Sequence, residues 1–137
     1  MSDIPARLRR LAGLRAGNQC EYCGLSQQGQ EATFHIDHIL PKSAGGRTRA
    51  ANLALACVSC SLRKEARRSA TEPITNRRVA MFHPRRQRWR DHFRWDGFRI
   101  VGLTPTGRAT VAALQMNRPL ILAIRREEAA RGRTFEQ

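Results

Sequence analysis

The stretch Phe34-His35-Ile36-Asp37-His38-Ile39-Leu40-Pro41 decides how the fold is assigned. Residues 32–40 are predicted to form a strand, since apolar residues alternate with polar ones from residue 32 to residue 37. In a regular strand His35 and Asp37 share one face, and His38 lies on the other. The sequence therefore predicts a strand that carries an adjacent Asp-His pair.

Two Cys-x-x-Cys pairs frame this stretch, Cys20 with Cys23 and Cys57 with Cys60, and 33 residues separate them. This separation exceeds the common zinc-ribbon spacing, so the chain between the pairs must have structure of its own. Four thiolates in two such pairs form a closed tetrahedral Zn²⁺ site; disulfides or unrelated free thiols are the alternatives. Structural zinc binds small peptides with roughly 10–16 kcal/mol. We therefore expect chelation to unfold the protein.

The composition favours a polyanionic partner. The 137 residues include 25 Lys and Arg against 11 Asp and Glu, a net charge of +14, and this length is typical of one domain. Nucleic acid is the first candidate partner and an anionic membrane surface the second. The N-terminal residues lack the apolar region of a signal peptide, and the apolar run over residues 119–124 is too short to span a bilayer. A cytoplasmic protein is therefore expected. No membrane partner is expected either, because the sequence has no long basic amphipathic helix with an aromatic apolar face.

The other segments predict a mixed α+β fold. Residues 52–56 are expected to form a short helical or turn segment, and residues 69–78 a polar connection. The dipeptide Asp96-Gly97 between two apolar segments predicts a two-residue β-hairpin. Helices are predicted over residues 5–16, 60–68 and 104–117, and from Pro119 onward.

Five aromatic residues alternate with arginines in the second half of the chain, and they have two interpretations. They could stack on nucleic-acid bases, or they could form the core around the predicted hairpin. The second interpretation is favoured, because aromatic side chains usually fill small cores. These residues are Phe82, Trp89, Phe93, Trp95 and Phe98.

The Asp37-His38 pair has the chemistry that phosphodiester hydrolysis needs. A histidine, with an ordinary pKa of about 6.5, can take a proton from the attacking water. An aspartate can hold a hard cation such as Mg²⁺ with few other protein ligands. Basic side chains on both sides of the pair are expected to contact the phosphates of nucleic acid. They are Lys42, Arg47, Arg49, Arg63, Lys64, Arg67 and Arg68.

Together these motifs resemble the zinc-containing HNH endonuclease family. The matching residues are Cys20-x-x-Cys23, Asp37-His38-Ile39-x-Pro41, Gly45-Gly46, Asn52-Leu53 and Cys57-x-x-Cys60 with Lys64. Residues 82–117 also resemble an extension of small stand-alone HNH proteins from bacteria. The resemblance implies a ββα-metal core (the His-Me finger) over about residues 18–68. The hairpin and helices predicted from the sequence extend over about residues 79–131. Both parts are expected to belong to one domain, residues 1–137.

The resemblance also implies an activity and a set of roles. It implies a nuclease that hydrolyses double-stranded DNA and nicks one strand per active site, in an oligomeric state that is left open. His38 matches the general base, Asp37 a ligand of the catalytic divalent cation, and Asn52 the residue that orients the base. An ordinary helix N-cap is the other interpretation of Asn52.

Ser61 departs from the family pattern, which has Asn or His there as a second ligand of the catalytic cation. A serine hydroxyl is a poor neutral ligand, so His35 or His83 are the alternative ligands, although each is also explained as a structural histidine. The departure leaves open a weakly active or non-catalytic, zinc-stabilised nucleic-acid-binding module. A component of a larger nucleic-acid-processing machine is a third interpretation.

Overall fold

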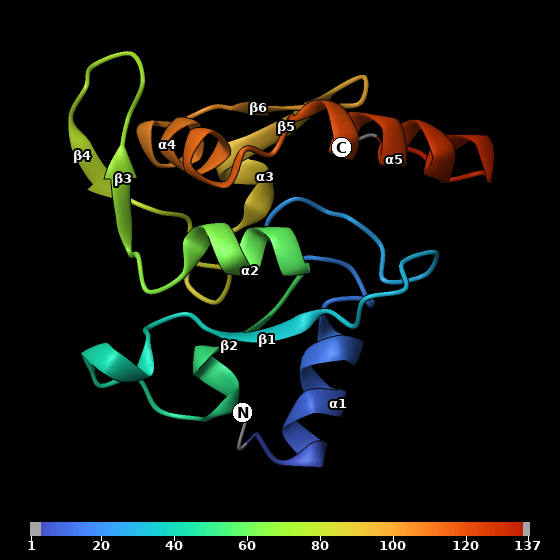
Figure 1. Cartoon of the computed structure of the whole chain (residues 1–137). Helices are drawn as coiled ribbons and strands as arrows, with labels where there is room; N and C mark the ends of the chain where they lie inside the picture. The colour runs from blue at the N-terminus through green and yellow to red at the C-terminus, as the bar shows by residue number, and fades with distance from the viewer. Residues whose placement is uncertain (1–3, 136–137) are drawn as a thin grey trace. The chain divides into compact units, whose positions relative to one another are not determined.

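The computed structural model describes residues 4–135, and the chain divides into two compact units (Figure 1). Unit 1 comprises residues 1–68 and 83–86, and unit 2 comprises residues 69–82 and 87–137. Both units contain helices and antiparallel strand pairs. The mixed α+β class predicted from the sequence is therefore confirmed.

Unit 1 is built around one antiparallel strand pair. Its elements are α1 (Ala6–Arg15), β1 (His35–His38), the short 3-10 helices η1 (Lys42–Ala44) and η2 (Ala50–Asn52), β2 (Leu53–Ala56) and α2 (Val58–Lys64). Asp37 on β1 lies opposite Ala54 on β2, and all four β2 residues are buried. The predicted helix or turn over residues 52–56 is therefore wrong. Strand pairing and burial outweigh the high intrinsic helix propensity of Leu and Ala.

Helix α1 packs through a narrow apolar face. Leu8 is buried beside Ile4 and Leu53, and Ala12 is buried one turn later. Leu14, in contrast, is 81% exposed. The leucines of this helix, Leu8, Leu11 and Leu14, follow one another at a spacing of three residues. That spacing drifts around a helix of 3.6 residues per turn, so only Leu8 faces the core.

Strand β1 and helix α2 are both shorter than predicted. In a longer strand, the backbone amide and carbonyl of Leu40 would pair with the backbone of a neighbouring strand. Here they bind the side chain of Asn52 instead, at 2.8 and 3.0 Å. Helix α2 ends at Lys64 because the next residue, Glu65, has a positive φ of 49°. A non-glycine residue in that region cannot continue a right-handed helix.

Unit 2 contains two hairpins and three helices in its described part. The elements are β3 (Ser69–Thr71), β4 (Arg78–Ala80), α3 (Trp89–His92), β5 (Phe93–Asp96), β6 (Arg99–Gly102), α4 (Pro105–Leu114) and α5 (Pro119–Ala130). β3 pairs with β4, and β5 pairs with β6 around Asp96-Gly97. The polar connection predicted over residues 69–78 is thus largely a hairpin. Its loop depends on the buried carboxylate of Glu72, a tertiary feature that local composition does not reveal.

Part of the aromatic series forms the core of unit 2. Phe82 and Phe93 are buried and meet edge to face, with ring centroids 5.2 Å apart. The guanidinium of Arg125 is also buried, 5.1 Å from the Trp95 ring centroid, and donates to the carbonyl of Met116 at 2.7 Å. The core interpretation is confirmed for Phe82 and Phe93.

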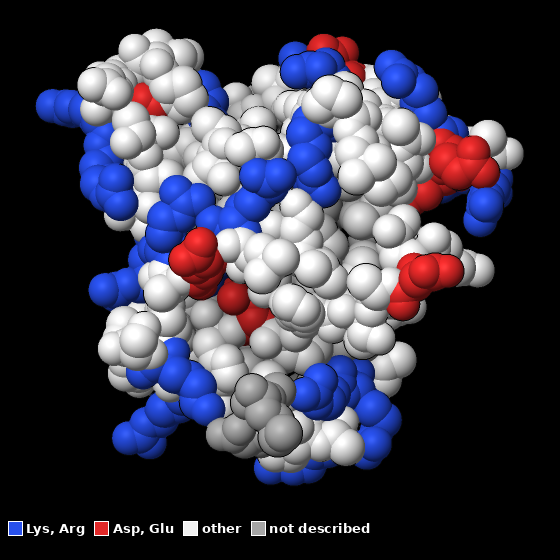
Figure 2. Space-filling model, in the orientation of Figure 1, with Lys and Arg blue, Asp and Glu red and all other residues white. Residues whose placement is uncertain are grey.

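Basic side chains are spread over the face drawn in Figure 2, with fewer acidic ones between them. Unit 1 has 13 basic and 5 acidic residues, a net charge of +8, and unit 2 has 12 and 6, a net charge of +6. Positive charge is therefore a property of both units. None of the helices within residues 4–135 has the length and apolar character that crossing a bilayer requires.

Candidate active site and metal centre

Four cysteine thiols meet at the start of α2. Their Sγ atoms lie within 4.8 Å of one another, and all four residues are buried. The Sγ atoms of Cys23 and Cys57 are 3.7 Å apart. Thiolates on a tetrahedral zinc ion with bonds of about 2.3 Å would be about 3.8 Å apart. Cys57 is also the N-cap of α2, and its Sγ accepts a hydrogen bond from the Cys60 amide at 3.4 Å. The cluster therefore has the ligands and spacing of a structural zinc site.

The thiols need a cation before all four can ionise. Burial raises the pKa of Cys20 well above its ordinary value, and hydrogen bonding with Cys20 and the other thiols raises that of Cys60. The pKa of Cys57 is lowered instead, because its sulfur accepts hydrogen bonds from Cys20 and Cys23. The neighbours thus stabilise one thiolate. Metal binding would release the remaining protons.

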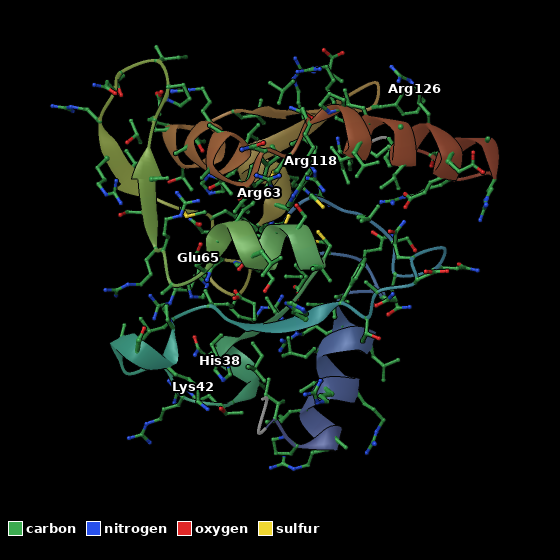
Figure 3. The ribbon with its side chains drawn as sticks, viewed as in Figure 1. His38, Lys42, Arg63, Glu65, Arg118 and Arg126 are labelled. Carbon is green, nitrogen blue, oxygen red and sulfur yellow. The ribbon has the colours of Figure 1, made fainter. Side chains whose placement is uncertain are left out.

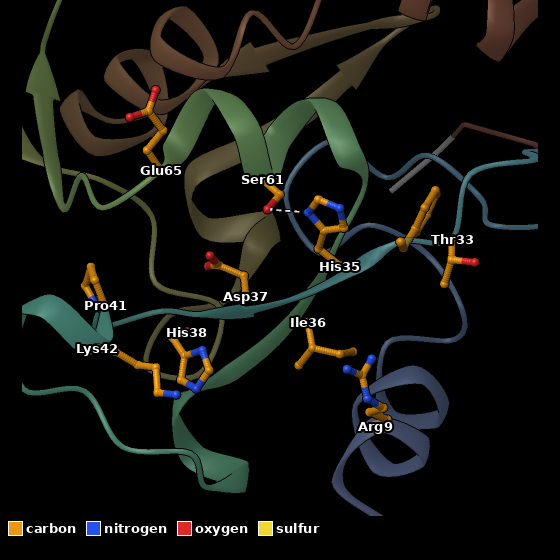
Figure 4. Close-up of a pocket in the computed structure, with 11 residues that line it drawn as sticks. Arg9, Thr33, His35, Ile36, Asp37, His38, Pro41, Lys42, Ser61 and Glu65 are labelled. Carbon is orange, nitrogen blue, oxygen red and sulfur yellow. Dashed lines mark hydrogen bonds between the residues drawn. The ribbon is translucent and has the colours of Figure 1, made fainter. Parts of the chain in front are cut away.

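Asp37 has a buried carboxylate on β1 that faces α2 (Figure 4). Its Oδ2 lies 3.1 Å from the Lys64 Nζ and accepts a hydrogen bond from the Tyr22 hydroxyl, also at 3.1 Å. Burial raises the pKa of Asp37, although Lys64 and Tyr22 act in the opposite direction. Both contacts use Oδ2, so Oδ1 is the oxygen that remains for a cation or a water molecule.

Lys64 is not placed to contact nucleic acid. The residue is 2% exposed, and its ammonium group donates to the carbonyl of Ile39 at 3.3 Å as well as pairing with Asp37. The prediction that Lys64 contacts phosphates is therefore wrong. The sequence showed a lysine near the end of a basic helix, but the helix turns that side chain into the interior of unit 1.

His38 is the last residue of β1 and points away from the Asp37 side of the strand (Figure 4). Its Nε2 lies 2.8 Å from the Thr48 Oγ1, a contact that fixes the plane of the imidazole. Which of the two atoms donates depends on the histidine tautomer.

Asn52 closes the loop that directly precedes Thr48. Its Oδ1 accepts from the Leu40 amide, and its Nδ2 donates to the carbonyls of Leu40 and Arg47 at 3.0 and 2.9 Å. The two ends of the loop over residues 40–47 are thereby joined, and Thr48 follows directly. The N-cap interpretation of Asn52 is wrong, because the residue after it begins a strand.

His35 and Ser61 meet on the same side of β1 as Asp37. The His35 Nδ1 lies 2.8 Å from the Ser61 Oγ, and Figure 4 shows this pair beside the Asp37 carboxylate. His83 belongs to a separate turn, where its Nδ1 accepts from the amides of Arg85 and Arg86 at 3.2 Å. Of the two alternative ligands, the structure brings only His35 to Asp37.

Asp37, His38, His35 and Ser61 line one cavity of about 490 Å³ in unit 1. Its wall combines two imidazoles, two carboxylates and two basic side chains with small polar and apolar groups. Arg9 and Glu65 line it and were not identified from the sequence, and neither were the Asp37 partner Tyr22 and the His38 partner Thr48. The lining residues are Arg9, Thr33, Phe34, His35, Ile36, Asp37, His38, Pro41, Lys42, Ser61 and Glu65.

The other predicted phosphate contacts differ in their positions. Lys42 lines the cavity, and Figure 3 labels it near His38. Arg47 is exposed on the loop that Asn52 holds. Arg63 donates from Nε to the Ser59 hydroxyl at 3.1 Å, and Arg67 donates to the carbonyl of Arg63 at 2.6 Å. Lys42 is therefore the one member of this set that the structure brings into the cavity wall.

The comparisons with known proteins agree with this geometry. Residues 20–67 match the family model described as HNH endonuclease. The search of curated proteins and the search of solved structures each found no match. The matched segment contains all four cysteines, the Asp37-His38 pair and Asn52. Residues 20–67 therefore carry a match to the HNH endonuclease family, and their four-cysteine cluster fits the zinc-containing form of that family.

Proposed function

We propose that unit 1 is a metal-dependent endonuclease that hydrolyses phosphodiester bonds of double-stranded DNA and nicks one strand per active site. The observation that carries the proposal is the cavity wall, to which β1 contributes Asp37 and His38 as adjacent residues beside Lys42 and Arg9. Such a wall offers a base, an oxygen ligand for a cation and positive charge for a phosphate. The order β1, β2, α2 around it fits a ββα-metal core.

Asp37, with His35 and Ser61 beside it, is the set that would hold the catalytic divalent cation, for example Mg²⁺. When bound, such a cation stabilises negative charge on the phosphate and on the leaving oxygen. Among residues 4–135 the four cysteines are the only cluster of three or more His, Cys, Asp or Glu ligands. The cavity thus suits an ion that keeps much of its water shell, as Mg²⁺ does.

His38 acts as the general base in this proposal. Its imidazole takes a proton from a water molecule as that water attacks the phosphorus, and the Thr48 hydroxyl holds the ring for this transfer. Asn52 contributes through the loop that it closes, since Thr48 follows Arg47 directly. Lys42 and Arg9 bind the phosphate oxygens, and the exposed Arg47 and Arg67, with the half-buried Arg63, contact the flanking DNA backbone.

Nicking of supercoiled plasmid tests the proposal. Zinc-loaded protein is incubated with Mg²⁺, Mn²⁺ or Ni²⁺, and His38→Ala is compared with His83→Ala, a histidine outside the cavity lining. We expect nicking that requires the divalent cation, falls at least a hundredfold in His38→Ala and persists in His83→Ala. Equal nicking by the two variants would remove His38 as the base.

One observation favours a second candidate function. The Asp37 carboxylate is already paired with a buried ammonium group, and Ser61 stands where a stronger ligand is expected. A zinc-stabilised module that binds nucleic acid without cleaving it would keep the cysteines and the charge. It would bind duplex DNA with unchanged affinity after Asp37→Asn and would nick no plasmid with any cation.

A further inference from the structure

The loop between β3 and β4 presents an isoleucine to solvent. Ile74 is 74% exposed, and it follows Pro73 in the loop that forms the free end of this two-stranded arm (Figure 1). Single exposed apolar residues are ordinary on protein surfaces. The loop that holds Ile74 is not ordinary, because a fully buried carboxylate organises it.

Glu72 fixes the conformation of this loop. It is 0% exposed, and its carboxylate accepts hydrogen bonds from the amides of Ile74 and Thr75 and from the Arg108 guanidinium at 2.9 Å. Its backbone carbonyl accepts from the Asn76 amide at 2.8 Å. A loop that is already ordered loses little conformational entropy when it binds a partner.

The charge of this arm points to a polyanionic partner. Residues 69–80 contain one acidic side chain, Glu72, which is buried and paired with Arg108. Arg77 and Arg78 are exposed on the same arm. Every charged side chain that the arm presents to solvent is therefore positive, and the exposed apolar side chain of Ile74 lies in the loop of the same arm.

We propose that the β3–β4 arm enters the minor groove of duplex DNA, with Ile74 as a wedge between base pairs and Arg77 and Arg78 on the flanking phosphates. Proteins that bind in this groove often insert apolar side chains, isoleucine among them, between base steps and kink the duplex. The narrow groove also attracts arginine. One isoleucine offers too little apolar area to hold a membrane surface. This inference rests on the proposed action of the chain on DNA.

The test measures binding and bending of DNA by the full chain loaded with zinc. The His38→Ala background is used so that the probe, a duplex of 30 base pairs labelled at both ends, stays intact. Fluorescence anisotropy gives the affinity, and energy transfer between the labels gives the bend. Ile74→Ala is compared with Leu120→Ala, which removes another exposed apolar side chain from unit 2.

We expect the parent protein to bend the duplex and Ile74→Ala to bind about tenfold more weakly with the bend lost. Leu120→Ala should stay within about twofold of the parent, and Arg77→Gln should reduce the slope of log affinity against log salt by about one. Unchanged affinity in Ile74→Ala, or a parent that binds without bending, would overturn the assignment of the arm. A parent that binds no duplex at all would overturn the proposed function with it.

Discussion

Tyr22, in the first Cys-x-x-Cys pair, donates its hydroxyl to the Asp37 carboxylate on β1 at 3.1 Å. The tyrosine is fully buried, and its own pKa is raised well above the ordinary value by burial and by the charge of Asp37. One of the two residues between the candidate zinc ligands Cys20 and Cys23 is thus also a direct partner of the candidate catalytic carboxylate. The conformation of the cysteine cluster and the position of the Asp37 carboxylate are therefore linked through Tyr22.

Replacing Tyr22 with phenylalanine keeps the ring and removes this hydrogen bond. Because the bond lowers the pKa of Asp37, its loss should raise that pKa further. The acid limb of the nicking rate should then move to higher pH, since Asp37 must be ionised to hold a cation. We also expect a loss of about 1–2 kcal/mol in folding free energy, measured by denaturant unfolding. An acid limb at the same pH as in the wild type would contradict the link.

Removing zinc should unfold unit 1. The four thiols are buried, and without a cation they repel one another once more than one of them ionises. Chelation of the loaded protein, followed by far-ultraviolet circular dichroism, should show a loss of secondary structure that added zinc restores. A melting curve that a strong chelator leaves unchanged would refute a structural role for the metal. Mutation of Cys57 to serine should reproduce the effect without a chelator.

Lys64 should matter for stability far more than its neighbours on the basic surface. Lys64→Met leaves the Asp37 carboxylate buried without its ion-pair partner, which typically costs about 3–5 kcal/mol. Arg67→Met, on an exposed residue shortly after α2, should cost less than about 0.5 kcal/mol. Urea unfolding of both variants checks the difference. Equal small losses would mean that the buried pair contributes little to the fold.

Glu72 should make stability depend on acidic pH. Burial opposes its ionisation, but hydrogen bonds from Arg108 and from the amides of Ile74 and Thr75 outweigh it and hold the pKa of Glu72 below the ordinary value of a glutamate. Its contribution is therefore complete above the ordinary glutamate pKa of about 4.3 and is lost as the pH falls through the lower, folded-state pKa.

The melting temperature of Glu72→Gln, followed from pH 7 to pH 3, checks this dependence. The variant should melt below the wild type at pH 7, and the difference should narrow in acid. Glu127→Gln is the control, because Glu127 forms an exposed pair with Arg131 and should change little at any pH. A difference between Glu72→Gln and the wild type that is the same at pH 7 and pH 3 would contradict the assignment.

The sequence predicted the cysteine cluster because Cys-x-x-Cys spacing directly encodes ligand geometry. It also predicted the pairing around Asp96-Gly97, where a two-residue turn has a local signature. Residues 52–56 were misjudged because four small and apolar residues carry no strand signal until β1 pairs with them. The burial of Lys64 and the contact between Thr48 and His38 depend on which side chains the fold turns inward. Local patterns contain no such information.

Chemical rescue of His38→Gly tests the central claim most directly. Glycine leaves a space beside Thr48 that free imidazole can enter as a replacement base. We predict that His38→Gly nicks plasmid at least a hundredfold more slowly than the wild type, and that millimolar imidazole restores part of the rate in this variant while leaving the wild type unchanged. A His38→Gly protein that is folded, binds DNA and nicks at the wild-type rate without imidazole would contradict the account.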